Sequence, residues 1–316
     1  MTLSVAPAVL LLAPARSGSS LASAVMGQHP QLCGLPELRL FHVDTVEELL
    51  ADQIPELSTS LRMAGLLRTL AEIHEGLQTT DSIERALRWL EGRRHWTTAQ
   101  VFRHVQECVF PRAIVEKSPE TVRTDSALTR AIAICPQARL VHLVRHPWAT
   151  VASMVDAWLW LPFWQITPEA AHEYCARVWI TQHERIMRLT AADPDRCFRV
   201  RIEDITDPIN SALAQFCHWA GLENSNRALA AMRRPDLSPF ARLGPPNAPG
   251  GFDPKFLEGP RLRPLVAPGG LAPPTNWLLH PGTLARAVTL ARQFGYRDAP
   301  DRHRALRWRQ ARHLRI

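Results

Sequence analysis

Four short apolar segments, each followed by a turn and then by a helical pattern, limit the fold more than any other feature. They are AVLLLAP (8–14), RAIVEKS (112–118), RLVHLVR (139–145) and CFRVRIED (197–204). Unbroken apolar runs of this length are typical of strands that are buried on both faces, as in a parallel sheet. Because helical patterns separate the runs, the order predicts an α/β fold with a doubly wound parallel sheet.

The chain around these strands predicts a single domain over residues 1–316, since no low-complexity linker divides it. Residues 43–110 form a long, mostly helical insertion. We expect it to cap the carboxyl ends of the strands, where open α/β sheets bind their ligands. Residues 238–274 are dense in proline and glycine, so we expect an irregular loop at the active site.

The positive charge of the chain is concentrated at its C-terminal end. Residues 300–316 carry six arginines and one aspartate, which supply +5 of the net charge of +7. Such a segment is typical of a solvated helix, and the alternative is contact with an acidic partner or a membrane surface. Because aromatic and basic residues do not alternate over a long stretch, we expect no nucleic-acid partner.

Cysteine spacing and hydropathy favour a cytoplasmic location. The six cysteines form no C-x-x-C pair and show no histidine spacing typical of zinc, so neither a disulfide framework nor a structural metal is indicated. No apolar run approaches the roughly 20 residues of a membrane span. The apolar segment near the N-terminus has no preceding lysine or arginine, which argues against a secretory signal.

The segment APARSGSS follows the first predicted strand and leads into a helix, which is where backbone N–H groups bind anions. Arg16 supplies charge, Gly18 permits close approach of the backbone, and Ser17, Ser19 and Ser20 offer hydroxyl donors. The alternative is a plain serine-rich turn. The G-x-x-x-x-G-K-[ST] pattern of nucleoside triphosphatases is absent, so the segment predicts an anion other than a metal-bound triphosphate.

A second candidate anion site lies in RHPWATVAS. Arg145 closes the third predicted strand, and Ser153 lies about two helical turns into the next helix, so both can reach one phosphate. Pro147 suits the first turn of that helix. Together with the first segment, this pair predicts a ligand with two phosphate-type anions.

These motifs resemble those of the sulfotransferases that use 3′-phosphoadenosine 5′-phosphosulfate (PAPS). The family's P-R-S-G-[ST]-[ST] loop is matched by ARSGSS, and its R-[DH]-P followed by a serine is matched by RHPWATVAS. The likeness continues through EKSP (116–119), RIEDI (201–205) and FGYRD (294–298). It is strongest to the bacterial branch that includes sulfotransferase domains of polyketide synthases, which sulfate a β-hydroxyl on a carrier-bound acyl chain.

The sequence departs from the family pattern at two positions. Ala15 replaces the usual proline, and Ile202 replaces a common tyrosine, which removes one contact expected near the nucleotide. Neither change removes an anion ligand, so the expected donor stays the same.

The resemblance implies the P-loop-like sulfotransferase fold, with PAPS as sulfuryl donor, its 3′,5′-bisphosphate (PAP) as product, and no metal. Arg16 is expected to stabilise the bridging oxygen and the 5′-phosphate, with Ser17, Gly18, Ser19 and Ser20 as the cradle. Arg145 and Ser153 are expected to bind the 3′-phosphate. Lys255, in the proline- and glycine-rich loop, is expected to close over the nucleotide, and the alternative is a solvated lysine.

An alcohol acceptor also needs a base, and Glu37 matches the position of the catalytic glutamate in the tyrosylprotein branch of the family. A carboxylate in a covered pocket has a raised pKa, which suits proton abstraction. The alternative for Glu37 is a helix-capping or surface role, and His42 is the second candidate base. Lys117 is expected near the sulfuryl group or the acceptor, with an ion pair to Glu116 as its alternative.

The aromatic segment WLWLPFW indicates where an acceptor binds. Trp158, Trp160, Phe163 and Trp164 form either part of the core or an apolar wall for the acceptor. With an irregular loop nearby, they favour a small apolar natural product or a carrier-bound acyl chain as acceptor.

Two rival functions remain open at this point. A metal-dependent P-loop small-molecule kinase would use Glu116 as its magnesium carboxylate, although the missing G-K-[ST] argues against it. A non-catalytic nucleotide-binding module would bind an acidic partner through the arginine-rich C-terminal segment.

Overall fold

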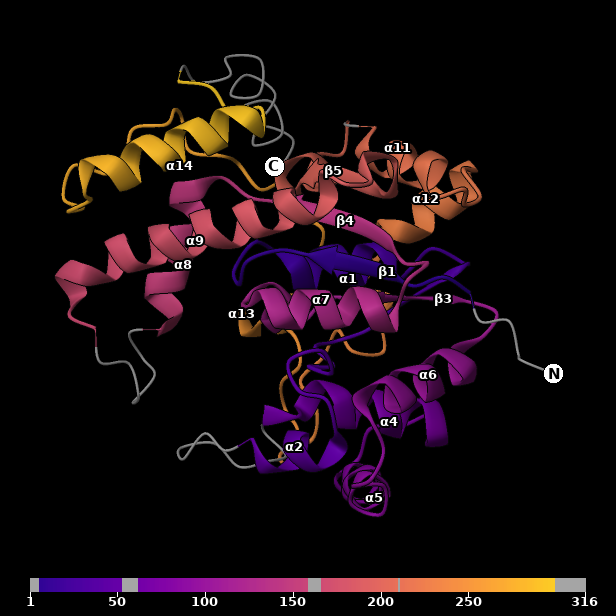
Figure 1. Ribbon diagram of the computed structural model, residues 1–316. Coiled ribbons are helices and arrows are strands. Elements are labelled where there is room, and N and C mark those ends of the chain that lie inside the picture. The colour runs from indigo at the N-terminus through magenta and orange to yellow at the C-terminus, as the bar shows by residue number, and fades with distance from the viewer. Residues whose placement is uncertain (1–5, 53–61, 159–165, 210, 299–316) are drawn as a thin grey trace.

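A five-stranded sheet forms the centre of the protein, as the computed structural model shows for residues 6–52, 62–158, 166–209 and 211–298 (Figure 1). The strands are β1 (Val9–Leu12), β2 (Leu32–Gly34), β3 (Ala113–Glu116), β4 (Arg139–Val144) and β5 (Cys197–Arg201). They lie in the order β2-β3-β1-β4-β5, and every neighbouring pair is parallel. The predicted α/β fold with a parallel sheet is therefore confirmed.

The strands agree with the four predicted segments except at two places. β2 was missed, because three residues that include a glycine give too short an apolar signal. The predicted strand over 197–204 ends at Arg201, and the next residues form the short helix α10 (Ile202–Thr206). The apolar pattern at Ile202 and Ile205 therefore belongs to a helix that packs on the sheet, since both residues are buried.

Alternate residues of the strands face two different hydrophobic clusters. On β1, Leu10 and Leu12 pack with α4 (Ala64–Glu75), α5 (Thr80–Glu91), α6 (Thr98–Val109) and α7 (Asp125–Ile134). Val9 and Leu11 pack instead with α1 (Ser19–Met26), α11 (Ala212–Trp219) and α12 (Asn226–Met232). Figure 1 shows α4, α5 and α6 grouped on one side of the sheet and α11 and α12 on the other. This two-sided burial explains why the strands are apolar at every position.

The region 43–110 contains α2 (Val46–Ala51), α4 (Ala64–Glu75), α5 (Thr80–Glu91) and α6 (Thr98–Val109). Three of these helices begin after a threonine whose side chain accepts a hydrogen bond from the N3 backbone N–H, namely Thr45, Thr79 and Thr97. In each case the N3 side chain returns a bond to the threonine backbone, which completes a capping box.

A third hydrophobic cluster joins three longer helices beside β4. They are α8 (Pro147–Trp158), α9 (Pro168–Thr190) and α14 (Pro281–Gln293), with Trp179 at 0% exposure and Phe294 among the buried rings. Each helix begins with a proline, a residue that suits the first turn because its missing N–H would have no helical partner. The predicted helix start at Pro147 is confirmed.

The segment 238–274 is irregular apart from one helical turn, α13 (Pro254–Leu257). Arg68 of α4 holds this segment in place, because its guanidinium donates to the Gly250 and Arg242 carbonyl oxygens, each at 2.8 Å. Three short 3-10 turns occur elsewhere: η1 (Pro119–Val122), η2 (Pro194–Arg196) and η3 (Pro235–Leu237). None of the helices in the described ranges has the length and hydropathy needed to span a lipid bilayer.

Candidate active site

The loop between β1 and α1 has the backbone shape of an anion-binding turn. Gly18 is the N-cap of α1 in the left-handed region, with φ of +83°, and Arg16 has φ of +65°, which is uncommon outside glycine. A Cβ atom on Gly18 would lie 2.8 Å from Cγ1 of Ile202. Glycine is therefore required there for both reasons, and the first-turn N–H groups of α1 have no partner within the helix.

The three serines of the loop differ in their partners. Ser17 is fully buried, and its Oγ has no hydrogen-bond partner in the described part of the chain. Ser20 Oγ accepts from Lys117 Nζ at 3.0 Å and from the Asp253 backbone N–H at 2.9 Å. Ser19 is also buried at the start of α1. A buried hydroxyl without a partner is costly, so Ser17 is a group that a bound ligand would satisfy.

The structure brings the second predicted anion site directly against the first. Arg145 donates to the Arg16 carbonyl oxygen at 2.7 Å, and Arg16 Nε donates to Ser153 Oγ at 3.1 Å. This follows from the sheet, because β1 and β4 are neighbours and both loops leave their carboxyl ends. Burial lowers the pKa of Arg145 from its usual value, and the Glu203 carboxylate opposes that shift.

Asp253 is a residue of this site that the sequence reasoning missed. Its carboxylate lies 2.7 Å from the Arg16 guanidinium, and its side chain also caps α13 by accepting from Lys255 N–H. Lys255 itself points to Asp156, 3.8 Å away, and both side chains are 67% exposed. The Asp-Pro pair before α13 was a detectable helix-start signal, but only the fold shows that this turn meets Arg16.

Glu37 and Lys117 form an ion pair beside the serine loop. The distance between Lys117 Nζ and Glu37 Oε1 is 2.6 Å; the lysine side chain is 0% exposed, whereas that of Glu37 is 31% exposed. The Lys117 ammonium also lies 5.0 Å from the centre of the Phe252 ring. Lys117 therefore links the candidate base to Ser20 of the anion loop.

The backbone at Glu37 is held by two segments that are distant in sequence. Its N–H donates to the Gly251 carbonyl oxygen at 3.0 Å, and a Cβ atom on Gly65 would lie 2.2 Å from the Glu37 carbonyl oxygen. The start of α4 thus packs directly on this residue. Burial raises the pKa of the Glu37 carboxyl above its usual value, Lys117 opposes the shift, and the nearby Glu120 adds to it.

Glu116 does not form the ion pair with Lys117 that was the alternative to a catalytic role for this lysine. It accepts hydrogen bonds from the Ser118 N–H at 2.9 Å and from the Ser118 hydroxyl, while Lys117 pairs with Glu37. Burial raises the pKa of Glu116 to about 7, opposed by its hydrogen bonds from Ser118. The Ser118 hydroxyl in turn accepts from Arg39 N–H, so Glu116 shapes the turn after β3.

His42, the second candidate base, belongs to a neighbouring polar cluster. Its Nδ1 lies 2.6 Å from the Arg39 carbonyl oxygen, and its Nε2 lies 3.1 Å from Asp52 Oδ2. Arg39 and Arg62 also approach that aspartate, at 3.5 and 3.4 Å. Both ring nitrogens are therefore engaged, and the structure does not join His42 to the Glu37–Lys117 pair.

The comparisons with known proteins identify the family to which this fold and loop belong. A model of the sulfotransferase family matches residues 7–226, which include both anion loops, Glu37 and Lys117. The chain belongs to the sulfotransferase family. No match was found among the curated protein sequences.

Two solved sulfotransferase domains share the fold of this sulfotransferase. The domain from the curacin biosynthetic pathway is 21% identical, covers 91% of this chain and 99% of its own, and has a TM-score of 0.72. The domain from the Synechococcus PCC 7002 olefin synthase is 22% identical, covers 91% of this chain and 95% of its own, and has a TM-score of 0.67. At this identity the likeness supports the fold alone.

Other charged residues of the sulfotransferase hold the sheet edge together. Glu203 accepts from the His146 N–H at 3.1 Å and from the Tyr296 hydroxyl at 2.9 Å, and Asp204 pairs with Arg201 at 2.7 Å. Ile202, which stands where relatives often have a tyrosine, is buried and packs against Gly18 of the anion loop. Its side chain is apolar, so the polar contact that a tyrosine could make near the nucleotide stays absent in the prediction.

The aromatic residues expected at the acceptor site fall in or beside a segment that lies outside the described residues. Trp160, Phe163 and Trp164 lie outside the described residues, and so does the arginine-rich segment 300–316. Trp158 is the last residue of α8, and its side chain is also outside the description.

Proposed function

We propose that this sulfotransferase transfers a sulfuryl group from PAPS to a hydroxyl of a small apolar natural product or acyl chain. The observation that carries the proposal is the chain of contacts from Glu37 through Lys117 to Ser20 of the anion loop. It places a carboxylate with a raised pKa, a buried cation and an anion cradle side by side. These are the parts that a hydroxyl acceptor and an anionic donor require.

The residues of the two loops fit the donor. The partnerless buried hydroxyl of Ser17 and the first turn of α1 suit the 5′-phosphosulfate, with the Arg16 guanidinium beside them. Arg145 and Ser153, which both contact Arg16, suit the 3′-phosphate. PAPS supplies an activated sulfuryl group, whose single negative charge can be held by cationic side chains without a metal.

The chain's own residues account for the proton and the charge. Glu37 removes the proton of the acceptor hydroxyl, whose oxygen then forms the new bond to sulfur as the bond from sulfur to the phosphate oxygen breaks. Charge develops on that leaving oxygen, and Arg16 and Lys117 are the cations that stabilise it. The Glu37–Lys117 pair also fixes the carboxylate in one orientation before the reaction.

The acceptor class rests on the motifs shared with the bacterial branch that includes polyketide-synthase sulfotransferase domains, which sulfate a carrier-bound acyl chain. The two solved domains of similar fold, from a curacin biosynthetic pathway and an olefin synthase, agree with this branch. We take residues 1–316 as one domain, with 43–110 as a helical cap and 238–274 as an active-site loop. Contacts of Gly65 and Gly251 with Glu37 support both assignments.

The test incubates the purified protein with PAPS and hydroxyl acceptors, each followed by the mass gain of a sulfonate. One β-hydroxyacyl chain should be offered both on a carrier protein and on free pantetheine. Titration of PAP should give the same affinity in magnesium and in EDTA. Glu37→Gln should reduce turnover about 10²- to 10⁴-fold, since a general base contributes that much. Arg16→Ala should weaken PAP binding.

The exposed Glu84→Gln on α5 is the matched control and should leave turnover unchanged. Turnover of ATP without turnover of PAPS would instead indicate a kinase. A non-catalytic module would be indicated if the protein bound PAP but transferred no sulfuryl group to any acceptor, and if Arg16→Ala left the PAP affinity unchanged. Full activity of Glu37→Gln would exclude this residue as the base while leaving sulfuryl transfer itself intact.

A further inference from the structure

Three potential metal ligands meet in the helical cap, at the end of α4 that lies away from Glu37. His74 lies near the end of α4, and His104 and Cys108 lie one turn apart on α6. The two Nε2 atoms are 2.8 Å apart, and Cys108 Sγ is 3.6 Å from His104 Nε2. The three ligand atoms all lie within 4.8 Å of one another.

The imidazoles are held in this orientation by an aromatic group. Trp89 of α5 stacks on His104, with ring centres 4.7 Å apart, and its centre is 5.4 Å from that of His74. The Arg93 guanidinium lies over the Trp89 ring, 4.1 Å from its centre. The ligand atoms themselves remain reachable, because His74 and Cys108 are exposed to solvent.

The nearest carboxylates are engaged with arginines and do not crowd the three ligands. Glu75, next to His74, is bonded by Arg85 Nε at 2.7 Å, and Glu107, next to Cys108, is bonded by Arg103 Nε at 3.2 Å. A cation bound here would thus have two nitrogen ligands, one sulfur ligand and one position facing water.

We propose that His74, His104 and Cys108 bind one zinc ion, with a water molecule as the fourth ligand. Imidazole and thiolate together select zinc over calcium or magnesium, which prefer oxygen. Zinc bonds of about 2.0 Å to nitrogen and about 2.3 Å to sulfur imply tetrahedral edges of about 3.3 Å between the nitrogens and about 3.5 Å from nitrogen to sulfur.

Small side-chain movements convert the observed cluster into that geometry. The nitrogens must separate by about 0.5 Å, whereas the distance of 3.6 Å from His104 Nε2 to Cys108 Sγ is close to the ideal edge. The third distance, from His74 to Cys108, is at most 4.8 Å and has to shorten by about 1.3 Å at most. Binding replaces the thiol proton of Cys108, which is released to solvent.

Zinc would join α4 to α6 at the end of α4 that lies away from Glu37. Gly65, at the other end, packs on the Glu37 backbone, and Arg68 between them holds the 238–274 segment. From Gly65 to His74 the helix runs about 14 Å at 1.5 Å per residue. The ion would therefore stabilise the cap without contacting the reacting groups, so this proposal does not depend on the proposed donor or acceptor.

The sequence gives little sign of this cluster. The spacing H-x-x-x-C on α6 is short, and His74 lies thirty residues earlier on another helix. Only the packing of α4 against α6 brings the three side chains together.

The test uses tag-free protein stripped with a chelator and titrated with zinc against a competing indicator. We expect one equivalent to bind, and cobalt in its place to show thiolate-to-metal charge transfer. Cys108→Ser should abolish that absorption, and His74→Asn should weaken zinc binding more than about 100-fold, because even outer-shell changes cost about 10- to 100-fold. Zinc should raise the melting temperature of the original protein but not of Cys108→Ser.

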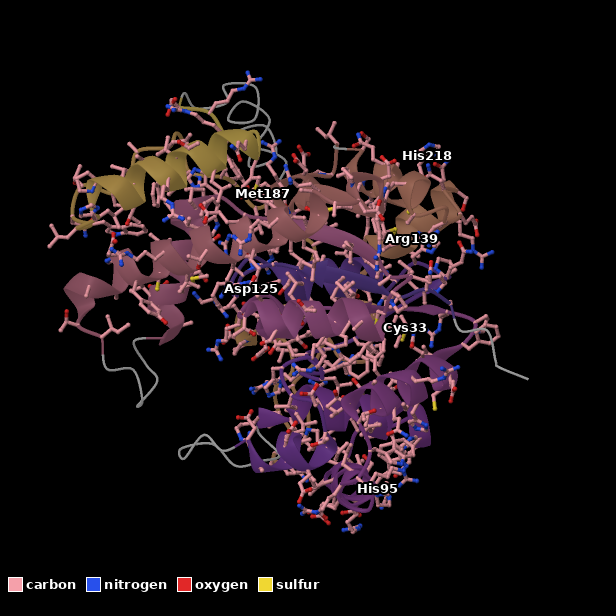
Figure 2. All side chains as sticks on the ribbon, in the orientation of Figure 1. Cys33, His95, Asp125, Arg139, Met187 and His218 are labelled. Carbon is pink, nitrogen blue, oxygen red and sulfur yellow. The ribbon has the colours of Figure 1, made fainter. Side chains whose placement is uncertain are left out.

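The matched control is His95→Asn, an exposed histidine in the same helical region (Figure 2). It should bind zinc like the original protein. The proposal is overturned if zinc does not bind, if Cys108→Ser binds it with unchanged affinity, or if His95→Asn weakens binding as much as His74→Asn does. Far-ultraviolet circular dichroism of each variant separates these outcomes from unfolding, which the exposed positions of His74 and Cys108 make a small risk.

Discussion

Two clusters of buried ionisable groups differ in what surrounds them. In one, Lys117 is sealed from solvent but its partner Glu37 keeps 31% of its side chain exposed. In the other, His142 of β4 and His183 of α9 face each other, with Nε2 and Nδ1 2.8 Å apart, and both residues are fully buried. The first cluster can meet a ligand, whereas the second can only contribute to stability.

Shifted pKa values alone do not separate these clusters. Burial raises the pKa of Glu37, and burial also lowers the pKa of His183 to about 3 and that of His142 well below its usual value. Arg199 adds to both histidine shifts and donates to His142 Nδ1 at 3.2 Å. Strongly perturbed groups are enriched at active sites but also occur in structural networks. Access to solvent is the property that distinguishes the Glu37 cluster.

The largest effect is expected from removing Lys117, the cation of the cluster that contains Glu37. Lys117→Met should reduce sulfuryl transfer about 10²-fold or more, the loss typical of one group that stabilises developing charge. Because Lys117 lowers the pKa of Glu37, the acid limb of the activity profile should also move to higher pH. Turnover measured against pH reports both changes.

An exposed cation provides the control for this substitution. Arg286→Met on α14, whose partner Glu184 lies 2.7 Å away, should change neither turnover nor its pH profile. An unchanged acid limb in Lys117→Met would show that Glu37 is not the group that titrates.

A smaller effect is expected from the buried pair of His142 and His183, and it concerns the stability of the fold rather than turnover. The folded pKa of His183 is about 3, below the usual 6.5, so the unfolded chain takes up the proton first. The contribution of His183 to the free energy of unfolding is therefore complete above pH 6.5 and is lost as the pH falls toward 3. The free energy of unfolding should fall by about 1.4 kcal/mol per pH unit from this residue alone.

His183→Gln should flatten that slope by about the same amount, because glutamine does not titrate in this range. Urea unfolding at several pH values from 7 to 4 measures it. The exposed His218→Asn on α11 is the control and should leave the slope unchanged (Figure 2). Equal slopes for the original protein and His183→Gln would mean that the sealed pair is protonated in the folded state.

The smallest effect is expected at Lys255, which is more exposed than any residue of the two clusters. Its side chain is 67% exposed, and its contact with Asp156 at 3.8 Å is long. Lys255→Ala should leave the melting temperature within experimental error, since exposed ion pairs contribute about 0–1 kcal/mol. If Lys255 closes over the nucleotide, the KM for PAPS should rise a few-fold with little change in kcat, and an unchanged KM would assign it to solvent.

Local signals explain which parts could be predicted from the sequence. Arg16 and Arg145 lie within a few residues of strand ends, and Ser153 lies two turns into the helix that follows β4. The apolar runs therefore located them, and the parallel order implied that they meet. Asp253 and Phe252 could not be found in this way, because their contacts with Arg16 and Lys117 cross more than a hundred residues of chain. β2 was missed because three residues leave too little pattern to detect.

The register between β1 and β4 determines how the two predicted anion loops lie relative to each other. Leu12, the last residue of β1, lies opposite His142, on strands about 4.8 Å apart, and β4 continues for two more residues to Val144 before its turn begins. Arg145 then reaches the Arg16 carbonyl oxygen and locks the two turns together. In the proposed complex with PAPS, the strand pairing therefore sets the distance between the two anion sites, and a slip of one residue in that pairing would change this distance.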